Sequence, residues 1–235
     1  MKALFLHSWG SSKRDWALLA PLLPFEIEPT FVDLRGFGDA PAPPGPYDVA
    51  SYADDVLRLV EGWTEYLLVG HSMGGKFALA AAMRRPEGLS RLLLVAPSPP
   101  TPEPMSEEDR AKSLADYGDR AAARETVAKV SRAPLPEAIR QAAEDDYVRT
   151  SERGWKSWLE AGSREDISGL MDRIEVPVRV VVGAEDPVMH PEMLRREVAD
   201  RLKDATLTEI SGAGHLLPVE KPHELAAFVA SNLRS

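Results

Sequence analysis

A serine between two glycines, at the junction of an apolar run and a helical pattern, most constrains how this chain can fold. The segment reads Gly70-His71-Ser72-Met73-Gly74, after the apolar run 66–69 and before the run of small and apolar residues 75–83. This order predicts a strand, a sharp turn and a helix. In such a turn the glycines leave room where strand and helix nearly touch, and the serine hydroxyl is presented at the top of a sheet. The helix directs its unpaired N–H groups and its positive end at the space beside Ser72.

Six short apolar runs predict the strands of that sheet. They lie near residues 2–7, 30–33, 66–70, 91–96, 178–183 and 206–210. Most are apolar at consecutive positions, which is typical of strands buried on both faces of a parallel sheet. Helical patterns between them cover about 52–63, then Leu194, Val198 and Leu202 after Pro191, and finally Leu225 to Leu233 after Pro222. Strands that alternate with helices predict a mostly parallel sheet flanked by helices.

One long stretch, residues 101–172, separates the fourth and fifth predicted strands and contains no strand-like run. It follows a proline-rich segment, 97–104, that cannot be helical. Helical patterns then occur around 107–116, 120–131, 137–149 and 154–161. A structureless loop of this length is uncommon in a compact domain. We therefore expect residues 101–172 to form a helical cap (lid) inserted into an α/β core of residues 1–100 and 173–235.

Composition narrows the class of protein. The 235 residues suffice for one large domain, and the absence of cysteine excludes disulfides and a thiol nucleophile. A net charge of −9 argues against nucleic acid as a partner, because neutralising phosphates requires a basic face. No apolar stretch approaches the length of a membrane span, and the N-terminus lacks a signal-peptide pattern. We expect a cytoplasmic protein that binds neither nucleic acid nor membranes.

A serine nucleophile needs a base, usually histidine, and an acid that orients the base. His215 follows the last predicted strand in a glycine-rich loop, at the carboxyl edge where open α/β sheets build their sites. Asp186 follows the fifth strand and is our candidate for the acid. Glu185 is its local competitor, because a shift of one residue in the loop would exchange the two.

Four other histidines have simpler interpretations. His71 is expected to point into the core, and His7 to brace the loop after the first strand. His190 and His223 lie in or next to helix starts and are expected to be solvated.

The oxyanion formed during acyl transfer needs backbone N–H donors. One donor is expected from Met73, the residue after the nucleophile, and the second from Trp9 in the loop after the first strand.

With these residues placed, the chain resembles the α/β-hydrolase superfamily along nearly its whole length, and in particular small bacterial carboxylesterase-like serine hydrolases. The matching segments are His7-Ser8-Trp9-Gly10, Asp33-Leu34-Arg35-Gly36-Phe37-Gly38, Gly70-His71-Ser72-Met73-Gly74-Gly75, Gly183-Ala184-Glu185-Asp186 and Gly212-Ala213-Gly214-His215. The chain departs from the family at Ser8, where glycine is usual, and it lacks the N-terminal hairpin of many relatives. The resemblance therefore implies a minimal sheet of about six strands with the first strand inside it. A serine at position 72 argues against haloalkane dehalogenases and epoxide hydrolases, which use aspartate there.

The expected activity is hydrolysis of carboxylic esters of small to medium apolar acids through an acyl-enzyme, with a small-molecule ester and water as substrates. Met189 and Leu216 lie near the predicted chemistry and suggest an apolar pocket. Trp155 and Trp158 share one helical face and either line that pocket or bury the cap against the sheet. No histidine or carboxylate spacing suggests a metal site, and no glycine-rich phosphate loop or dinucleotide motif suggests a cofactor.

The same triad serves other chemistry, so several alternatives stay open. A carrier-protein methyl esterase would need a basic patch for an acidic partner, whereas residues 101–172 hold more Asp and Glu than Lys and Arg. A lactonase, a C–C bond hydrolase, a perhydrolase or an acyltransferase would use the same residues. A non-enzymatic ligand receptor on this fold is the alternative of a different class. The sequence does not indicate an oligomeric state.

Overall fold

A six-stranded parallel sheet forms the centre of the computed structural model, which describes residues 1–233. The strands are β1 (Lys2–Leu6), β2 (Glu28–Val32), β3 (Tyr66–His71), β4 (Leu89–Val95), β5 (Val178–Gly183) and β6 (Ala205–Ile210). Their order is β2-β1-β3-β4-β5-β6, and every neighbouring pair is parallel. The prediction of a parallel sheet of about six strands, with the first strand inside it, is confirmed.

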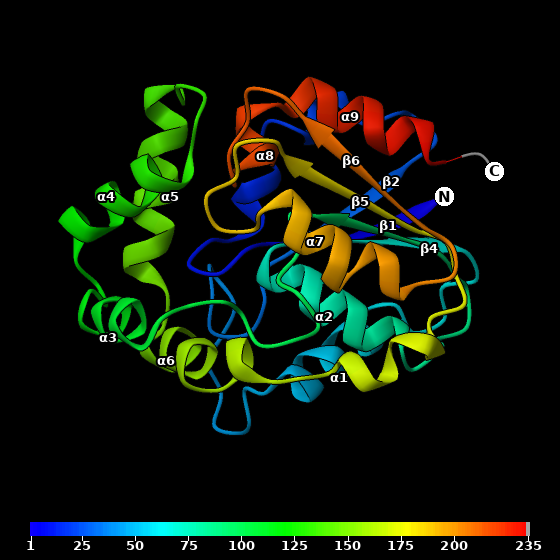
Figure 1. The fold of residues 1–235 in the computed structure, drawn as a ribbon, viewed down its shortest axis with the longest axis horizontal. Helices are drawn as coiled ribbons and strands as arrows, with labels where there is room; N and C mark the ends of the chain where they lie inside the picture. Colours follow the sequence, from blue (N-terminus) through cyan, green and yellow to red (C-terminus); the bar gives the residue numbers. More distant parts are fainter. Residues whose placement is uncertain (234–235) are drawn as a thin grey trace.

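The two faces of the sheet are covered by different helices, because successive side chains of a strand point to opposite faces. On one face, Leu4 and Leu6 of β1 pack in a cluster with residues of α1 (Val49–Leu59), α2 (Met73–Ala82) and α7 (Pro191–Glu197). On the other face, Ala3 and Phe5 pack with Trp16 and with residues of α9 (Pro222–Ser231). In Figure 1, α9 lies on one side of the sheet, and α1 and α2 lie on the other.

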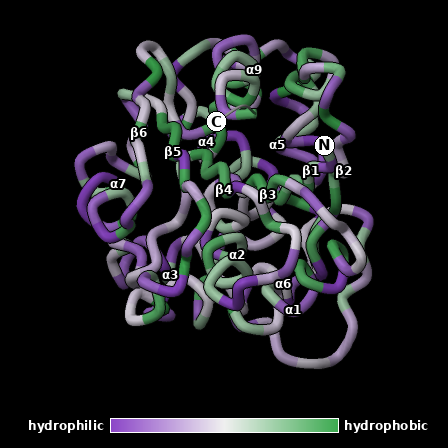
Figure 2. Tube along the Cα trace, turned by 90° about the vertical axis from the view of Figure 1, so that its right-hand side faces the viewer, coloured by the Kyte–Doolittle hydropathy of each residue, from purple (hydrophilic) through white to green (hydrophobic). Residues whose placement is uncertain are grey.

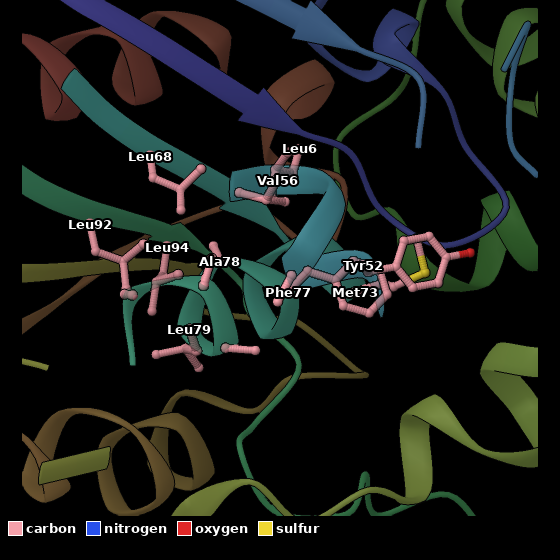
Figure 3. Close-up of a cluster of buried hydrophobic side chains, with 14 of the residues drawn as sticks. Leu6, Tyr52, Val56, Leu68, Met73, Phe77, Ala78, Leu79, Leu92 and Leu94 are labelled. Atoms are coloured by element: carbon pink, nitrogen blue, oxygen red, sulfur yellow. The ribbon is translucent and has the colours of Figure 1, made fainter. Parts of the chain in front are cut away.

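The first of these clusters fixes the helix that follows Ser72. Figure 3 shows Leu6, Leu68 and Leu92 of the strands facing Val56 of α1 and Phe77 of α2. The Phe77 ring stacks on Tyr52 of α1, with centroids 4.1 Å apart. In Figure 2 the central strands are the most hydrophobic part of the trace, whereas α7 carries many hydrophilic residues. Because α2 is buried between the sheet and α1, the residues at its N-terminus have little freedom to move.

Four α-helices lie between β4 and β5, in the segment predicted as the cap, and we keep that name for residues 101–172. They are α3 (Glu107–Ala115), α4 (Arg120–Val130), α5 (Glu137–Arg149) and α6 (Glu152–Glu160). The side chains of Ser106, Asp119 and Ser151 cap the starts of α3, α4 and α6. Figure 1 shows these helices beyond the arrowheads of β5 and β6, at the carboxyl edge of the sheet.

Some predicted boundaries were wrong. α1 begins at Val49, because Asp48 caps it by accepting from the Ser51 amide. The pattern after Pro191 does not form one helix to Leu202, since α7 ends at Glu197 and a short 3-10 segment, Ala199–Arg201, follows. The last helix begins at Pro222 rather than Leu225, in keeping with the preference of proline for the first helical position.

Candidate active site

The turn between β3 and α2 holds Ser72 in a strained conformation. Its φ is 50° and its ψ is −118°, values that a residue with a side chain rarely adopts. A Cβ at Gly70 would lie 2.5 Å from the carbonyl oxygen of Gly74, and a Cβ at Gly74 would lie 2.6 Å from that of His7. The two glycines therefore allow β3, α2 and the end of β1 to meet, which gives the Gly-x-Ser-x-Gly pattern its physical reason.

Three loops at the carboxyl edge of the sheet bring Ser72, His215 and Asp186 together. Nε2 of His215 lies 3.0 Å from Oγ of Ser72, and Nδ1 of His215 lies 2.8 Å from Oδ2 of Asp186. The other carboxylate oxygen of Asp186 accepts from the amides of Val188 at 2.7 Å and Met189 at 2.9 Å. All three site residues are buried, so the hydrogen-bonded chain is largely shielded from bulk water.

Burial and the His215–Asp186 ion pair have opposite effects on the pKa values of these two residues. Burial favours the neutral form of His215, but the neighbouring carboxylate of Asp186 outweighs it and raises the pKa of the imidazole above its ordinary value. Burial also favours the neutral form of Asp186, but His215 and the two amides lower the pKa of that carboxyl. The acid is therefore ionised, and it supports positive charge on the ring that faces the serine.

The alternatives for the acid and the base lie elsewhere. Glu185 is exposed, and its carboxylate accepts from the Gly212 amide at 3.1 Å rather than from His215. His190 and His223 are exposed, as expected. His7 is buried and braces the loop after β1: its Nδ1 lies 2.7 Å from the Ser8 carbonyl, and its Nε2 accepts from the Leu34 amide.

His71 forms a second buried histidine–carboxylate pair directly behind the first. Its Nδ1 lies 2.6 Å from Oδ2 of Asp15, and its Nε2 lies 2.9 Å from the main-chain oxygen of His215. Both ring nitrogens of His71 therefore lie at hydrogen-bonding distance from oxygen atoms. His71 lowers the pKa of Asp15 although burial alone would raise it. Sequence analysis placed His71 in the core but missed Asp15, because nothing in its local pattern indicates a partner 56 residues away.

The loop after β1 lies beside the nucleophile, where the second oxyanion donor was predicted. The Ser8 amide donates to Asp15 at 3.1 Å and is therefore occupied. The amides of Trp9 and Met73 have no acceptor within residues 1–233, and the Met73 side chain is buried in the core. These two N–H groups stay our candidates for the oxyanion hole.

The four predicted pocket residues differ in their surroundings. The ring of Trp155 lies 4.0 Å from that of Trp9, and its indole N–H donates to the Ser113 carbonyl. Trp158, one helical turn away, packs edge-on against Phe77 of α2. Both tryptophans are buried, so both hold the cap against the core. Met189 is also buried, and Leu216 is half-buried beside His215. That these residues line a substrate pocket stays a prediction.

Two charged residues near the site escaped the sequence analysis. Lys76 on α2 is fully buried, and its Nζ donates to the carbonyls of Thr101 at 3.2 Å and Glu165 at 2.6 Å. Burial lowers the pKa of Lys76 to about 8. Glu103 lies close enough to His215 and Lys76 to feel both charges, but burial prevails and raises the pKa of its carboxyl. Lys76 could have been noticed in the sequence, because it is the one charged residue in the otherwise apolar run 73–82.

Within residues 1–233 no group of three or more His, Cys, Asp or Glu side chains is arranged to hold a metal ion. Within the same residues no helix has both the length and the apolar composition of a membrane span.

Known proteins with similar sequences and structures agree with this fold. Residues 3–228 match the model of the alpha/beta hydrolase family. The chain is similar to a pimeloyl-[acyl-carrier protein] methyl ester esterase of Neisseria meningitidis serogroup B, with 28% identity that covers 99% of this chain and 94% of the relative. It is also similar to 3-oxoadipate enol-lactonase 2 of Acinetobacter baylyi, with 26% identity over 93% of this chain and 83% of the relative. The structure of an esterase from Exiguobacterium antarcticum superposes with a TM-score of 0.91 at 22% identity, covering 100% of this chain and 92% of that one. Since the family model spans nearly the whole chain, this protein belongs to the alpha/beta hydrolase family.

Proposed function

We propose that this protein hydrolyses carboxylic esters through an acyl-enzyme, with Ser72 as nucleophile, His215 as base and Asp186 as the residue that orients the base. The observation that carries the proposal is the continuous chain from Ser72 Oγ through the His215 ring to Asp186, with links of 3.0 and 2.8 Å. A neutral serine hydroxyl is a weak nucleophile, and this arrangement is the one that activates it.

In the first step, Oγ of Ser72 bonds to the ester carbonyl carbon while its proton passes to Nε2 of His215. The carbonyl oxygen becomes an oxyanion, which the amides of Trp9 and Met73 would receive. His215 then gives its proton to the leaving alkoxy oxygen, the C–O bond breaks, and the alcohol departs. Water repeats the sequence on the acyl-enzyme: His215 takes a proton from it and returns this proton to Ser72 as the acid leaves.

The substrate class that we favour is an ester of a small to medium apolar acid, with water as co-substrate. The apolar surroundings of Met189 and of the Trp9–Trp155 pair support it. We infer that the cap, residues 101–172, is a lid over a core of residues 1–100 and 173–235. The relatives named as a methyl ester esterase and an enol-lactonase support acyl chemistry in general. The excess of acidic over basic residues in the cap disfavours an acidic carrier protein as the partner.

Ser72→Ala is the decisive test, assayed with p-nitrophenyl acetate and a fluorophosphonate probe. We expect kcat to fall by about 10⁴-fold or more, with loss of covalent labelling. Ser98→Ala is the matched control, because Ser98 is a buried serine whose amide donates to the Ser72 carbonyl at 2.9 Å. It should keep kcat within about threefold, as expected for a residue outside the chemistry. Substantial hydrolysis by Ser72→Ala would refute the assignment.

A second assay distinguishes the substrate classes. Wild-type protein is offered p-nitrophenyl esters of increasing chain length, simple lactones and a carrier-protein methyl ester. We expect kcat/KM to be highest for the short and medium p-nitrophenyl esters. A strong preference for the carrier-bound ester would replace the proposed substrate class, and probe labelling without turnover of any ester would favour a receptor.

A further inference from the structure

A single buried carboxylate, that of Glu220, connects the loop of His215 to the cap. Glu220 is the last residue of α8 (Leu217–Glu220) and is 8% exposed. Its Oε2 accepts from the amides of Gly214 at 3.0 Å, Arg132 at 2.6 Å and Ala133 at 2.8 Å. Its Oε1 accepts from the amide of Leu216 at 2.9 Å. Two of these donors flank His215 in the sequence, and the other two belong to the loop between α4 and α5.

A second contact joins the same two segments without Glu220. The amide of His215 donates to the carbonyl of Val130, the last residue of α4, at 2.8 Å. A Cβ at Gly214 would lie 2.5 Å from that carbonyl oxygen, so the cap main chain lies directly against the loop of the histidine. The main chain on both sides of the proposed base is therefore held by groups of the cap or by the carboxylate that binds the cap.

The chemistry of these bonds makes Glu220 hard to replace. An ionised carboxylate has two oxygens that act only as acceptors, so it can satisfy four converging N–H groups at once. Such charge-assisted bonds are roughly twice as strong as neutral ones. A glutamine of the same shape has one acceptor oxygen, and its NH₂ group would face N–H donors.

We propose that Glu220 is a positioning residue for His215: it fixes the histidine loop to cap residues 130–133, so that the reach of the imidazole to Ser72 depends on where the cap sits. The inference rests on the proposed function of His215 as the base. It adds that this end of the cap cannot lift without disturbing the base, so substrate enters elsewhere along the cap.

Glu220→Gln tests the proposal in the full-length protein with p-nitrophenyl acetate. We expect kcat to fall by about 10- to 100-fold, the scale expected when a catalytic group is displaced by about 1 Å, with KM changed less than about threefold. A looser His215–Asp186 bond would also shift the acid limb of kcat/KM to lower pH, because that bond raises the pKa of the imidazole. A role in stability alone would move neither kcat nor the pH profile once the folded fraction is accounted for.

Glu144→Gln is the control matched for burial. Glu144 is also a buried carboxylate of the cap, but its partners are Arg120, Arg124 and Arg140 rather than the histidine loop. We expect it to lower thermal stability and leave kcat and the pH profile close to those of the wild type. Glu220→Asp keeps the charge and withdraws the carboxylate by one methylene; it should give an intermediate kcat, and it replaces Glu220→Gln if that variant does not fold.

Wild-type kcat and an unshifted acid limb in folded Glu220→Gln would overturn the inference, as would equal kcat losses in Glu220→Gln and Glu144→Gln. These outcomes differ from failure of the proposed function itself. If Ser72→Ala retained activity, both ideas would fall, whereas an inactive Ser72→Ala beside an unaffected Glu220→Gln would remove only the role of Glu220.

Discussion

The proposed triad and the cap are held in place in different ways. Ser72, Asp186 and His215 each follow a parallel strand, so the backbone hydrogen bonds of the sheet bring them to one edge. The cap is joined to the core by the packing of Trp155 and Trp158, by a few main-chain hydrogen bonds and by polar side chains that bridge distant segments. The strands therefore fix the positions of the three proposed triad residues. The position of the cap depends in part on individual charged side chains, each of which a substitution can remove.

Three of these side chains lie at separate places. Lys76 of α2 binds the carbonyls of Thr101 and Glu165, near the two ends of the inserted segment. Asp146 of α5 accepts from the Ser12 hydroxyl at 2.7 Å and pairs with Arg14, both in the segment after the loop of Trp9. Glu220 joins the remaining side of the cap to the histidine loop. If the comparison holds, changes in the triad should abolish the chemistry, and changes in the bridges should reduce it by degrees.

Asp186→Asn should give the largest effect after loss of the nucleophile. The amide can no longer stabilise the imidazolium or fix its tautomer, so we expect kcat to fall by about 10⁴-fold. In the wild type, the acid limb of kcat/KM should lie above about pH 6.5, because His215 must be neutral to act as base and its pKa is raised. Without the carboxylate, burial dominates and the limb should move to lower pH. Steady-state kinetics from pH 5 to 9 measure both quantities.

Glu185→Gln is the control for this prediction, since it changes the neighbouring carboxylate of the same loop. Glu185 is exposed and binds only the Gly212 amide among residues 1–233. We expect kcat within about threefold of the wild type, as is usual for surface substitutions. A large loss in this variant together with a mild one in Asp186→Asn would exchange the roles of the two acids.

Asp146→Asn should give an intermediate effect, because it weakens a bridge while leaving the triad intact. The Asp146 side chain is buried and binds Ser12 and Arg14, which follow the loop that supplies the proposed donor Trp9. Losing its charge should lower kcat by about tenfold through a less well aligned oxyanion hole, less than the loss of a donor itself. The hydrolysis rate at saturating p-nitrophenyl acetate tests this. Glu144→Gln, in the same helix but bound to arginines of the cap, should leave the rate nearly unchanged.

The same difference between strand-positioned groups and groups that bridge distant segments explains which features could be predicted from the sequence. The apolar runs predicted all six strands, and each chemical residue proposed for the triad follows a strand at a position that the run itself indicates. The helices of the cap were predicted to within a few residues because a helical pattern is a local signal. Asp146 and Glu220 could not be predicted as bridges, nor Asp15 as the partner of His71. Their partners are chosen by how distant segments pack, and an acidic residue on a polar helix face is ordinarily solvated.

Lys76→Met should give the smallest effect on activity. Its main effect should be on the free energy of unfolding, because it removes a buried ammonium group. The substitution keeps the length of the side chain, removes two hydrogen bonds and removes a buried charge, so these contributions partly cancel at pH 7. Because the pKa of Lys76 is lowered to about 8, the folded protein releases this proton while the unfolded chain, near pKa 10.4, still holds it. The stability of the wild type relative to Lys76→Met should therefore rise between about pH 8 and 10, by at most about 1.4 kcal/mol per pH unit. Urea unfolding of both proteins across this range measures the difference.

Lys112→Met is the control of opposite sign, because Asp116 raises the pKa of Lys112 and its contribution should not grow over the same range. A flat difference for Lys76→Met would mean that burial does not lower the pKa of Lys76 in the folded protein.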